Sequence, residues 1–261
     1  MINTERYIIN PVSLLYFYTR FVKITLLMEV ESIDSLKEIW EGFDFTYLLS
    51  ILLGVVPALV CITLHELSHG YTAYLLGDDT AKSQGRLTLN PLKHLDFMGL
   101  LMMVVFHVGW AKPVPVNMFK FKNPKRDMAV TALAGPVSNI LISIVFLFLF
   151  GALYVPLSSF AAGAYILQML ELTAEISLGL AIFNFLPVPP LDGSKVLFSC
   201  LSNENYYKLM HYERYGMIIM FILVATGILG RPLSWLINTV YGWLFPVAQF
   251  ACDIVVKLFY I

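Results

Sequence analysis

The sequence predicts an all-α polytopic membrane protein with five or six transmembrane helices. Hydrophobic residues make up 58% of the 261 residues and charged residues only 13%, and the mean hydropathy is +0.74. Soluble domains average about a quarter charged residues and somewhat under half apolar ones, so this composition indicates a chain that lies largely in lipid. The formal net charge is −1 and the sequence has no basic run, so nucleic acid is not an expected partner.

The chain divides into three predicted segments. Residues 1–44 form an N-terminal amphipathic or first-span segment, residues 45–200 a membrane core, and residues 201–261 the C-terminal transmembrane helices. Within the first segment, residues 7–28 have an uncharged part shorter than the ~20 residues that a span needs. We expect this part to lie at the membrane interface, or to span only if Arg20 and Lys23 extend their charged ends to the surface.

Apolar runs mark the remaining helices. The first clear run begins at Phe45, and the others cover residues 128–150, 164–185, 215–230 and 233–256, the last interrupted by Pro246. Between the first two lies a short apolar run at residues 98–108, rich in valine and bounded by glycine and proline. Such a run favours strands, so the sequence predicts a small membrane-associated β element here whose edge could pair with an extended peptide. An ordinary connecting turn fits this stretch equally well.

The most informative stretch is an H-E-x-x-H motif, His65-Glu66-Leu67-Ser68-His69, set in the run that begins at Phe45. Ionisable groups in a transmembrane segment are costly and are usually kept for function. On a helix, His65 and His69 lie one turn apart on one face, where two imidazoles can share a zinc ion. Glu66 stands beside the first of them, where a carboxylate can act as a general base. The motif predicts a zinc hydrolase site within a membrane helix.

A third metal ligand must come from elsewhere in the chain. Glu171 and Glu175 lie one turn apart in an apolar run and are candidates by the same membrane argument. Asp192 follows a break that contains Pro187, Pro189 and Pro190, and it is predicted on an irregular turn from which its carboxylate can point at a metal. Because the H-E-x-x-H motif lacks a third ligand, Asp192 is the leading candidate. A site with only three good protein ligands keeps an open position, as catalytic zinc sites do.

Charge distribution predicts the orientation, and cysteine spacing excludes one kind of site. Eight basic residues against three acidic ones between positions 78 and 126 indicate a cytoplasmic loop, which places the motif toward the cytoplasm. The cysteines Cys61, Cys200 and Cys252 are far apart and odd in number, so neither a disulfide framework nor a cysteine zinc site is expected.

Four motifs taken together resemble those of the site-2 protease family, the intramembrane zinc metalloproteases. They occur in the family's order over roughly residues 45–200. They are the H-E-x-x-H motif at residues 65–69, Gly109-Trp110-Ala111-Lys112-Pro113-Val114-Pro115-Val116-Asn117, Gly135-Pro136-Val137-Ser138-Asn139, and the stretch from Asn184 to Gly193.

The resemblance implies that His65, His69 and Asp192 bind one Zn²⁺ per chain and that Glu66 is the general base and acid. It implies that Asn184 holds the substrate carbonyl or its oxyanion. It also implies that the stretch from Trp110 to Asn117 borders the strand that binds substrate. Glu171 and Glu175 are not part of this pattern. The chain differs from better-known members in having no room for a PDZ insertion, so we expect a compact form.

The expected function is therefore intramembrane hydrolysis of peptide bonds in or near transmembrane segments of membrane proteins. The expected partners are a transmembrane protein or peptide substrate, the lipid bilayer and a regulatory membrane partner. The expected location is a bacterial cell membrane with the active site toward the cytoplasm. Two alternatives stay open from the residues alone: a membrane zinc protease of another type that acts on soluble peptides, and a membrane protein that binds zinc without catalysis.

Overall fold

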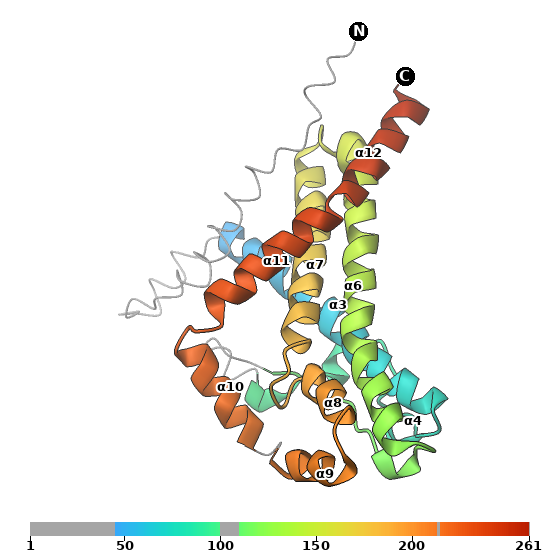
Figure 1. Cartoon of the computed structure of the whole chain (residues 1–261). Coiled ribbons are helices and arrows are strands. Elements are labelled where there is room, and N and C mark those ends of the chain that lie inside the picture. The colour runs from blue at the N-terminus through green and yellow to red at the C-terminus, as the bar shows by residue number, and fades with distance from the viewer. Residues whose placement is uncertain (1–44, 100–109, 213–214, 261) are drawn as a thin grey trace, which may run out of the picture. The chain divides into compact units, whose positions relative to one another are not determined.

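The computed structural model describes residues 45–99, 110–212 and 215–260, and this part of the chain is almost entirely helical (Figure 1). The chain divides into two units, residues 1–53 and residues 54–261, and every site residue discussed below belongs to the second. The helix α3 covers Phe45–Leu75, and its residues 45–53 are the described part of the first unit.

Four helices in the described part of the chain are long and apolar enough to cross a membrane, which indicates an integral membrane protein. They lie in α3, in α6 (Pro124–Leu157), in α7 (Ala161–Asn184), and in the pair α11 (Gly230–Leu244) and α12 (Pro246–Phe259). The predicted break at Pro246 is confirmed, because that residue begins α12 and so separates it from α11.

The predicted count of five or six spans is not supported. The run at residues 215–230 forms α10, Gly216–Ala225, which has ten residues and rises only ~15 Å, half of what a bilayer core requires. The other uncertain span, at residues 7–28, lies outside the described residues.

The predicted β element is not supported either, because the described residues contain no strand. Residues 100–109, where the strands were expected, lie outside the described part. On either side of that gap, Leu95 and Ala111 form a single antiparallel bridge, and Lys112 N donates to His94 O at 2.9 Å. The two ends of the segment therefore meet in an antiparallel sense without forming a sheet.

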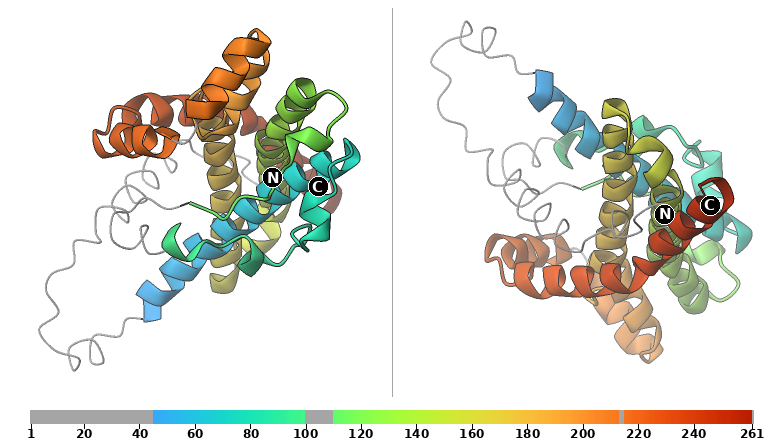
Figure 2. Two further views of the ribbon diagram at one scale, coloured as in Figure 1. Left: turned by 90° about the horizontal axis from the view of Figure 1, so that it is seen from below. Right: turned by 90° about the horizontal axis from the view of Figure 1, so that it is seen from above.

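The helix α6 makes most of the packing contacts of the second unit. It lies beside α7 along much of its length and also contacts α12 and the short helix α8, Asp192–Ser199 (Figures 1 and 2). Gly151 allows the approach of α12, because a Cβ at Gly151 would lie 2.6 Å from the carbonyl carbon of Ala248. Small residues serve in this way at helix contacts in membranes, where lipid supplies no hydrophobic drive between helices.

Buried polar contacts connect the helix α3 to α6 and to α7. Cys61 Sγ donates to Thr173 O of α7 at 3.5 Å, and His69 Nδ1 lies 2.7 Å from Thr131 O of α6. All three cysteines are free, as expected. Because the H-E-x-x-H motif lies toward the C-terminal end of α3, these contacts place it against the N-terminal half of α6.

Short elements complete the second unit. The connection after α7 passes through the three prolines and ends where α8 begins, and α8 is followed by α9, Asn203–Tyr212. The described residues between α3 and α6 include the short turns α4 (Thr80–Ser83), η2 (Pro91–Lys93) and η3 (Met118–Lys120).

Candidate metal centre

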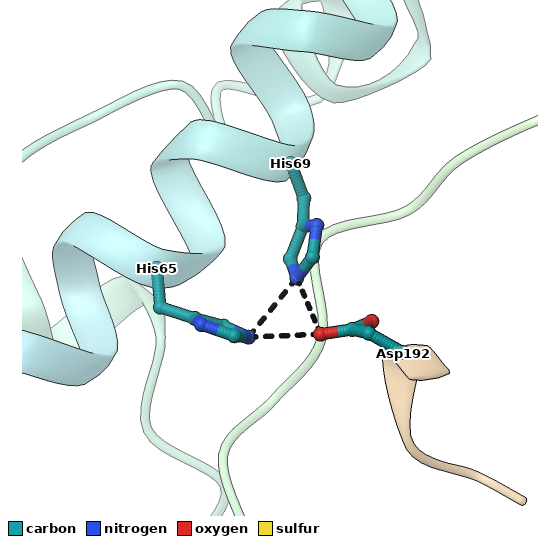
Figure 3. A group of neighbouring side chains, drawn as sticks. All are labelled: His65, His69 and Asp192. Carbon is teal, nitrogen blue, oxygen red and sulfur yellow. Dashed lines mark hydrogen bonds and ion pairs between the residues drawn. The ribbon is translucent and has the colours of Figure 1, made fainter. Parts of the chain in front are cut away.

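Two imidazoles and one carboxylate converge between α3 and α8. His65 Nε2 and His69 Nε2 lie 3.0 Å apart, and Asp192 Oδ2 lies 3.2 Å from the first and 3.1 Å from the second (Figure 3). All three residues are buried. In the described part of the chain, this is the group of side chains that could hold a metal ion.

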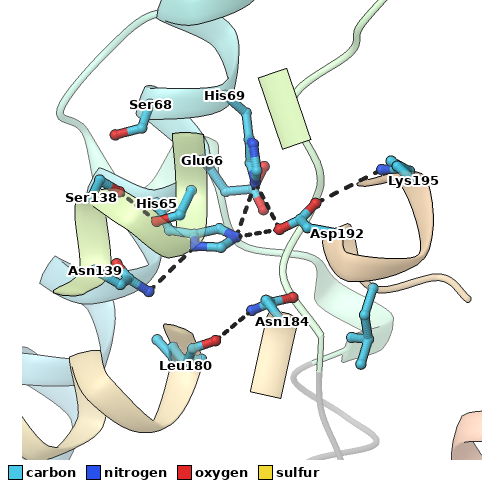
Figure 4. Close-up of polar contacts among 12 residues, drawn as sticks. His65, Glu66, Ser68, His69, Ser138, Asn139, Leu180, Asn184, Asp192 and Lys195 are labelled. Atoms are coloured by element: carbon cyan, nitrogen blue, oxygen red, sulfur yellow. Dashed lines mark hydrogen bonds and ion pairs between the residues drawn. The ribbon is translucent and has the colours of Figure 1, made fainter. Parts of the chain in front are cut away.

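The hydrogen bonds on the far side of each imidazole favour a metal-binding tautomer. His69 Nδ1 lies 2.7 Å from Thr131 O, a carbonyl that can only accept, so Nδ1 carries the proton and Nε2 keeps its lone pair. The Asn139 amide reaches His65 Nδ1 at 3.3 Å, and Asn139 Oδ1 has no hydrogen-bond partner among the described residues (Figure 4). A half-turn of this amide makes Oδ1 the acceptor for His65 Nδ1–H, which frees the His65 Nε2 lone pair as well.

This arrangement fits a zinc ion. Three electron-rich atoms about 3 Å apart repel one another unless a cation lies between them. Ligands at ~2.0–2.1 Å from a tetrahedral zinc are ~3.3 Å apart, close to the three separations observed here. Two histidine nitrogens with one carboxylate oxygen form a donor set typical of catalytic zinc, which leaves a fourth position for water or substrate.

Asp192 is held in place by a glycine and a lysine. It is the first residue of α8, so the prediction of an irregular turn is correct only for the residues before it. A Cβ at Gly193 would lie 2.6 Å from Leu186 O, so only glycine lets the proline-rich connection fold back against the start of α8. Lys195 Nζ lies 3.9 Å from Asp192 Oδ1, the oxygen that faces away from the histidines (Figure 4).

Asp192 is ionised at neutral pH. Burial raises the pKa of its carboxyl group, but the adjoining imidazoles of His65 and His69 and the positive charge of Lys195 lower it by more. The pKa therefore lies well below the ordinary range for an aspartate. A carboxylate that stays charged at physiological pH needs no deprotonation before it can bind a metal.

Glu66 lies beside this group without belonging to it. Its Oε2 accepts a hydrogen bond from Val114 N at 2.8 Å, and the Val114 side chain packs close to Gly70 of α3. This bond fixes one oxygen of the carboxylate. Figure 4 shows Glu66 next to His65 and His69. A carboxylate in this position can exchange a proton with a water molecule at the metal group.

Gly135 of α6 faces both imidazoles. A Cβ at this position would lie 2.5 Å from His69 Cε1 and 2.6 Å from His65 Cε1. We therefore expect Gly135→Ala to displace the imidazoles and to weaken zinc binding by roughly 10- to 100-fold, as loss of a supporting contact commonly does. Competition with a chromogenic chelator measures the affinity.

The matched control for this change is Gly179→Ala in α7. The nearest atom to a Cβ at Gly179 is Ile237 Cδ1 at 3.7 Å, an ordinary van der Waals distance, so zinc affinity should stay at the wild-type value. Equal affinities for both variants would contradict the close approach of α6 to the histidines.

The other predicted site residues are placed less directly. Asn184 lies at the C-terminal end of α7, and its Nδ2 donates to Leu180 O at 2.9 Å (Figure 4). Asn117 Oδ1 accepts from Phe119 N at 3.1 Å and so caps η3, whereas the backbone of Trp110 lies against the Cβ position of Gly99. None of these contacts reaches the metal group. Neither Glu171 nor Glu175 is part of that group either.

Four site features were not predicted from the sequence. They are the Thr131 carbonyl, the contact of Asn139 with His65, the approach of Gly135, and the Val114 amide at Glu66. Two of them had a signal at the level of sequence, since Gly135 and Asn139 belong to one of the four motifs. Backbone donors and acceptors carry no signal in the identity of their residues.

A buried His-His-Asp group with an adjacent glutamate, built from α3 and the short helix α8 in a chain with four described helices long enough to cross a bilayer, defines a membrane metallohydrolase. The model of peptidase family M50 matches residues 155–229. A zinc metalloprotease by name, YwhC of Bacillus subtilis, is 37% identical over 209 residues, which are 78% of this chain and 90% of the relative.

Two further relatives carry zinc metalloprotease names. Rip2 of Mycolicibacterium smegmatis is 31% identical over 205 residues, covering 77% of this chain and 75% of the relative. MJ0611 of Methanocaldococcus jannaschii is 30% identical over 160 residues, covering 60% and 76%. No solved structure matches. The chain belongs to peptidase family M50, the site-2 proteases, and is a zinc metalloprotease of the intramembrane type.

Proposed function

We propose that this protease hydrolyses peptide bonds in or beside the transmembrane segments of other membrane proteins, with His65, His69 and Asp192 as zinc ligands and Glu66 as general base and acid. The observation that carries the assignment is the convergence of the two Nε2 atoms and Asp192 Oδ2 within 3.2 Å of one another. Zinc, when bound there, lowers the pKa of a coordinated water toward neutrality and polarises the substrate carbonyl.

Glu66 moves the proton in this proposal. Its Oε2 is engaged by Val114 N, which leaves Oε1 to take a proton from the attacking water. The same oxygen then delivers the proton to the leaving amine, so the carboxylate returns to its starting state. The surroundings of Glu66 and the histidines are apolar helices, which strengthen each of these electrostatic interactions by excluding bulk water.

Asn184 is proposed to hold the substrate carbonyl or its oxyanion. A side-chain amide has two N–H donors, and only one of those on Asn184 is needed for Leu180 O. In this proposal the second donor points toward a substrate carbonyl held at the metal group. A donor fixed by its own helix stabilises developing negative charge without having to reorganise.

The substrate is proposed to bind in extended form. A transmembrane helix ties up its own carbonyls, so it must unwind locally before hydrolysis, and pairing with an edge can hold the unwound segment. The antiparallel bridge at Ala111 supports placing such an edge between Trp110 and Asn117, next to the β element proposed for residues 98–108. Further spans beyond the four described helices complete the membrane domain in this proposal.

The active site is proposed to face the cytoplasm of a bacterial cell. The connection between α3 and α6 is rich in lysine, which favours the cytoplasmic side. The partners of the protein are proposed to be a transmembrane substrate, the bilayer and a regulatory membrane protein. Without a PDZ insertion, substrate selection falls to the membrane domain or to such a partner.

The test uses purified protein in lipid vesicles with a single-span model substrate, and with a soluble peptide of the same cleavage sequence as control. We expect cleavage within the span, mapped by mass spectrometry, which stops on treatment with 1,10-phenanthroline and returns with added zinc. Cleavage of the soluble peptide at a comparable rate would indicate a membrane protease of another type. Bound zinc without cleavage of either substrate would favour a non-catalytic metal site.

A further inference from the structure

Three charged side chains hold the segment of residues 112–117 against the C-terminal end of α3. Arg86 Nη2 donates to Lys112 O at 2.8 Å and to Pro113 O at 3.2 Å. Glu66 Oε2 accepts from Val114 N at 2.8 Å, and Asp78 Oδ2 accepts from Asn117 N at 2.6 Å. The segment is thus fixed on both sides of the amide that contacts Glu66.

The burial of Arg86 calls for an explanation. Arg86 is only 8% exposed. Among the described residues, its guanidinium has no carboxylate at ion-pair distance, and its Nε has no hydrogen-bond partner. Burying a charge is strongly unfavourable unless it is paired and hydrogen-bonded. Within the described part of the chain, this cation donates its hydrogen bonds to the two backbone carbonyls, so its position is tied to that of the segment.

Asp78 is buried in the same way on the other side. It is fully buried, its Oδ1 accepts from the amide and hydroxyl of Thr80, and Lys120 Nζ lies 3.9 Å from that oxygen. The remaining oxygen, Oδ2, holds Asn117 N. A charge-assisted bond from a buried carboxylate to a backbone amide is stronger than a neutral hydrogen bond.

The backbone between these two anchors has little freedom. Lys112 and Val114 each precede a proline, which disfavours helical conformations for them, and Pro113 and Pro115 have fixed φ angles. A segment that is stiff and anchored at both ends presents its Val114 amide in one direction. That direction is toward Glu66 Oε2.

We propose that Arg86 and Asp78 are positioning residues for catalysis: they hold residues 112–117 so that the Val114 amide fixes one oxygen of Glu66 and leaves the other free for proton transfer. Neither residue touches the metal group, and both act through the backbone of this segment. The inference rests on the proposed role of Glu66 as general base.

Arg86→Met is the first variant of the test, and Arg126→Met is its matched control. Arg126 is an exposed arginine at the start of α6 whose charge pairs with Asp127. We expect Arg86→Met to retain zinc and to lose roughly 10- to 100-fold in kcat, the size expected when a hydrogen bond to a charged group is lost. Arg86→Lys should not rescue kcat, because an ammonium lacks the planar fork that reaches both carbonyls.

Val114→Pro removes the amide hydrogen and replaces the valine side chain by a ring, while Arg86 stays in place. Val114→Ala also removes the valine side chain but keeps the amide, so the ratio of kcat between these two variants reports the change at the backbone nitrogen that faces Glu66. The double variant Arg86→Met with Val114→Pro should be no slower than Val114→Pro, since both changes remove the same contact. Losses that multiply, or equal kcat for the proline and alanine variants, would overturn the inference.

Hydrogen exchange of the zinc-loaded protein separates this inference from the proposed function. The Val114 amide should exchange slowly in the wild type and faster in Asp78→Asn and Arg86→Met, whether or not any substrate is cleaved. If the wild type fails to cleave, the proposed function fails and the exchange result still stands. Unchanged exchange in both variants would overturn the positioning role, even for an active enzyme.

Discussion

Glu66→Gln should abolish proteolysis while leaving bound zinc at the wild-type level. Glutamine has nearly the same shape as glutamate, and its side-chain carbonyl can still accept the hydrogen bond from Val114 N. It cannot take a proton from water at neutral pH, so the loss in kcat should reach at least the roughly 10²- to 10⁴-fold that general acid–base catalysis contributes. Zinc is retained because Glu66 is not one of the three ligand candidates.

This prediction is checked by zinc analysis of both proteins and by single-turnover cleavage of the model substrate. Glu204→Gln makes the same chemical change at an exposed residue of α9, whose carboxylate pairs with Lys208 one turn away. Because exposed pairs contribute little to stability, this control should cleave at the wild-type rate. Cleavage by Glu66→Gln within a few-fold of the control would show that another group handles the proton.

Asp192→Ala should remove the metal as well as the activity. The variant loses the oxygen that lies 3.2 Å from His65 Nε2 and 3.1 Å from His69 Nε2, and two imidazoles alone do not form a structural or catalytic zinc site. We expect zinc to be lost on dialysis against a weak chelator that leaves the wild type loaded. Cleavage should fall below detection, since both the positioning and the activation of water are lost.

Glu171→Gln and Glu175→Gln provide the discriminating comparison. Both glutamates are intramembrane carboxylates that the sequence alone left as candidates for the third ligand, and both lie outside the His-His-Asp group. Zinc content should be unchanged in each of these variants. If Asp192→Ala kept its zinc and Glu175→Gln lost it, the ligand assignment would be wrong and so would the proposed geometry of the site.

The motif on α3 was readable from the sequence because its geometry is local. His65, Glu66 and His69 lie within one turn of one helix, so their spacing alone puts the two imidazoles on one face. The apolar runs that form α3, α6 and α7 were readable for the same reason, since each long run must satisfy its backbone hydrogen bonds as a helix in lipid. Family membership follows from several such local motifs in one order.

Predictions failed where a run was short or its outcome depended on neighbours. Residues 215–230 looked like a span by composition, but the helix α10 ends at Ala225, five residues before α11 begins at Gly230. Arg86 was one of the basic residues from which a cytoplasmic loop was predicted, and its burial against two backbone carbonyls was not predicted. Composition reports neither the end of a helix nor the burial of a charge.

The sequence by itself determined the class of protein, the long membrane helices and the two histidines with their glutamate. Tertiary structure decided which distant carboxylate joins them, since Asp192 reaches His65 across the turn that closes on Gly193. It also decided what holds Glu66, because the partner is a backbone amide supplied by a segment 48 residues away. Local spacing fixes groups on one helix, whereas contacts between segments depend on packing and on backbone atoms that every residue shares.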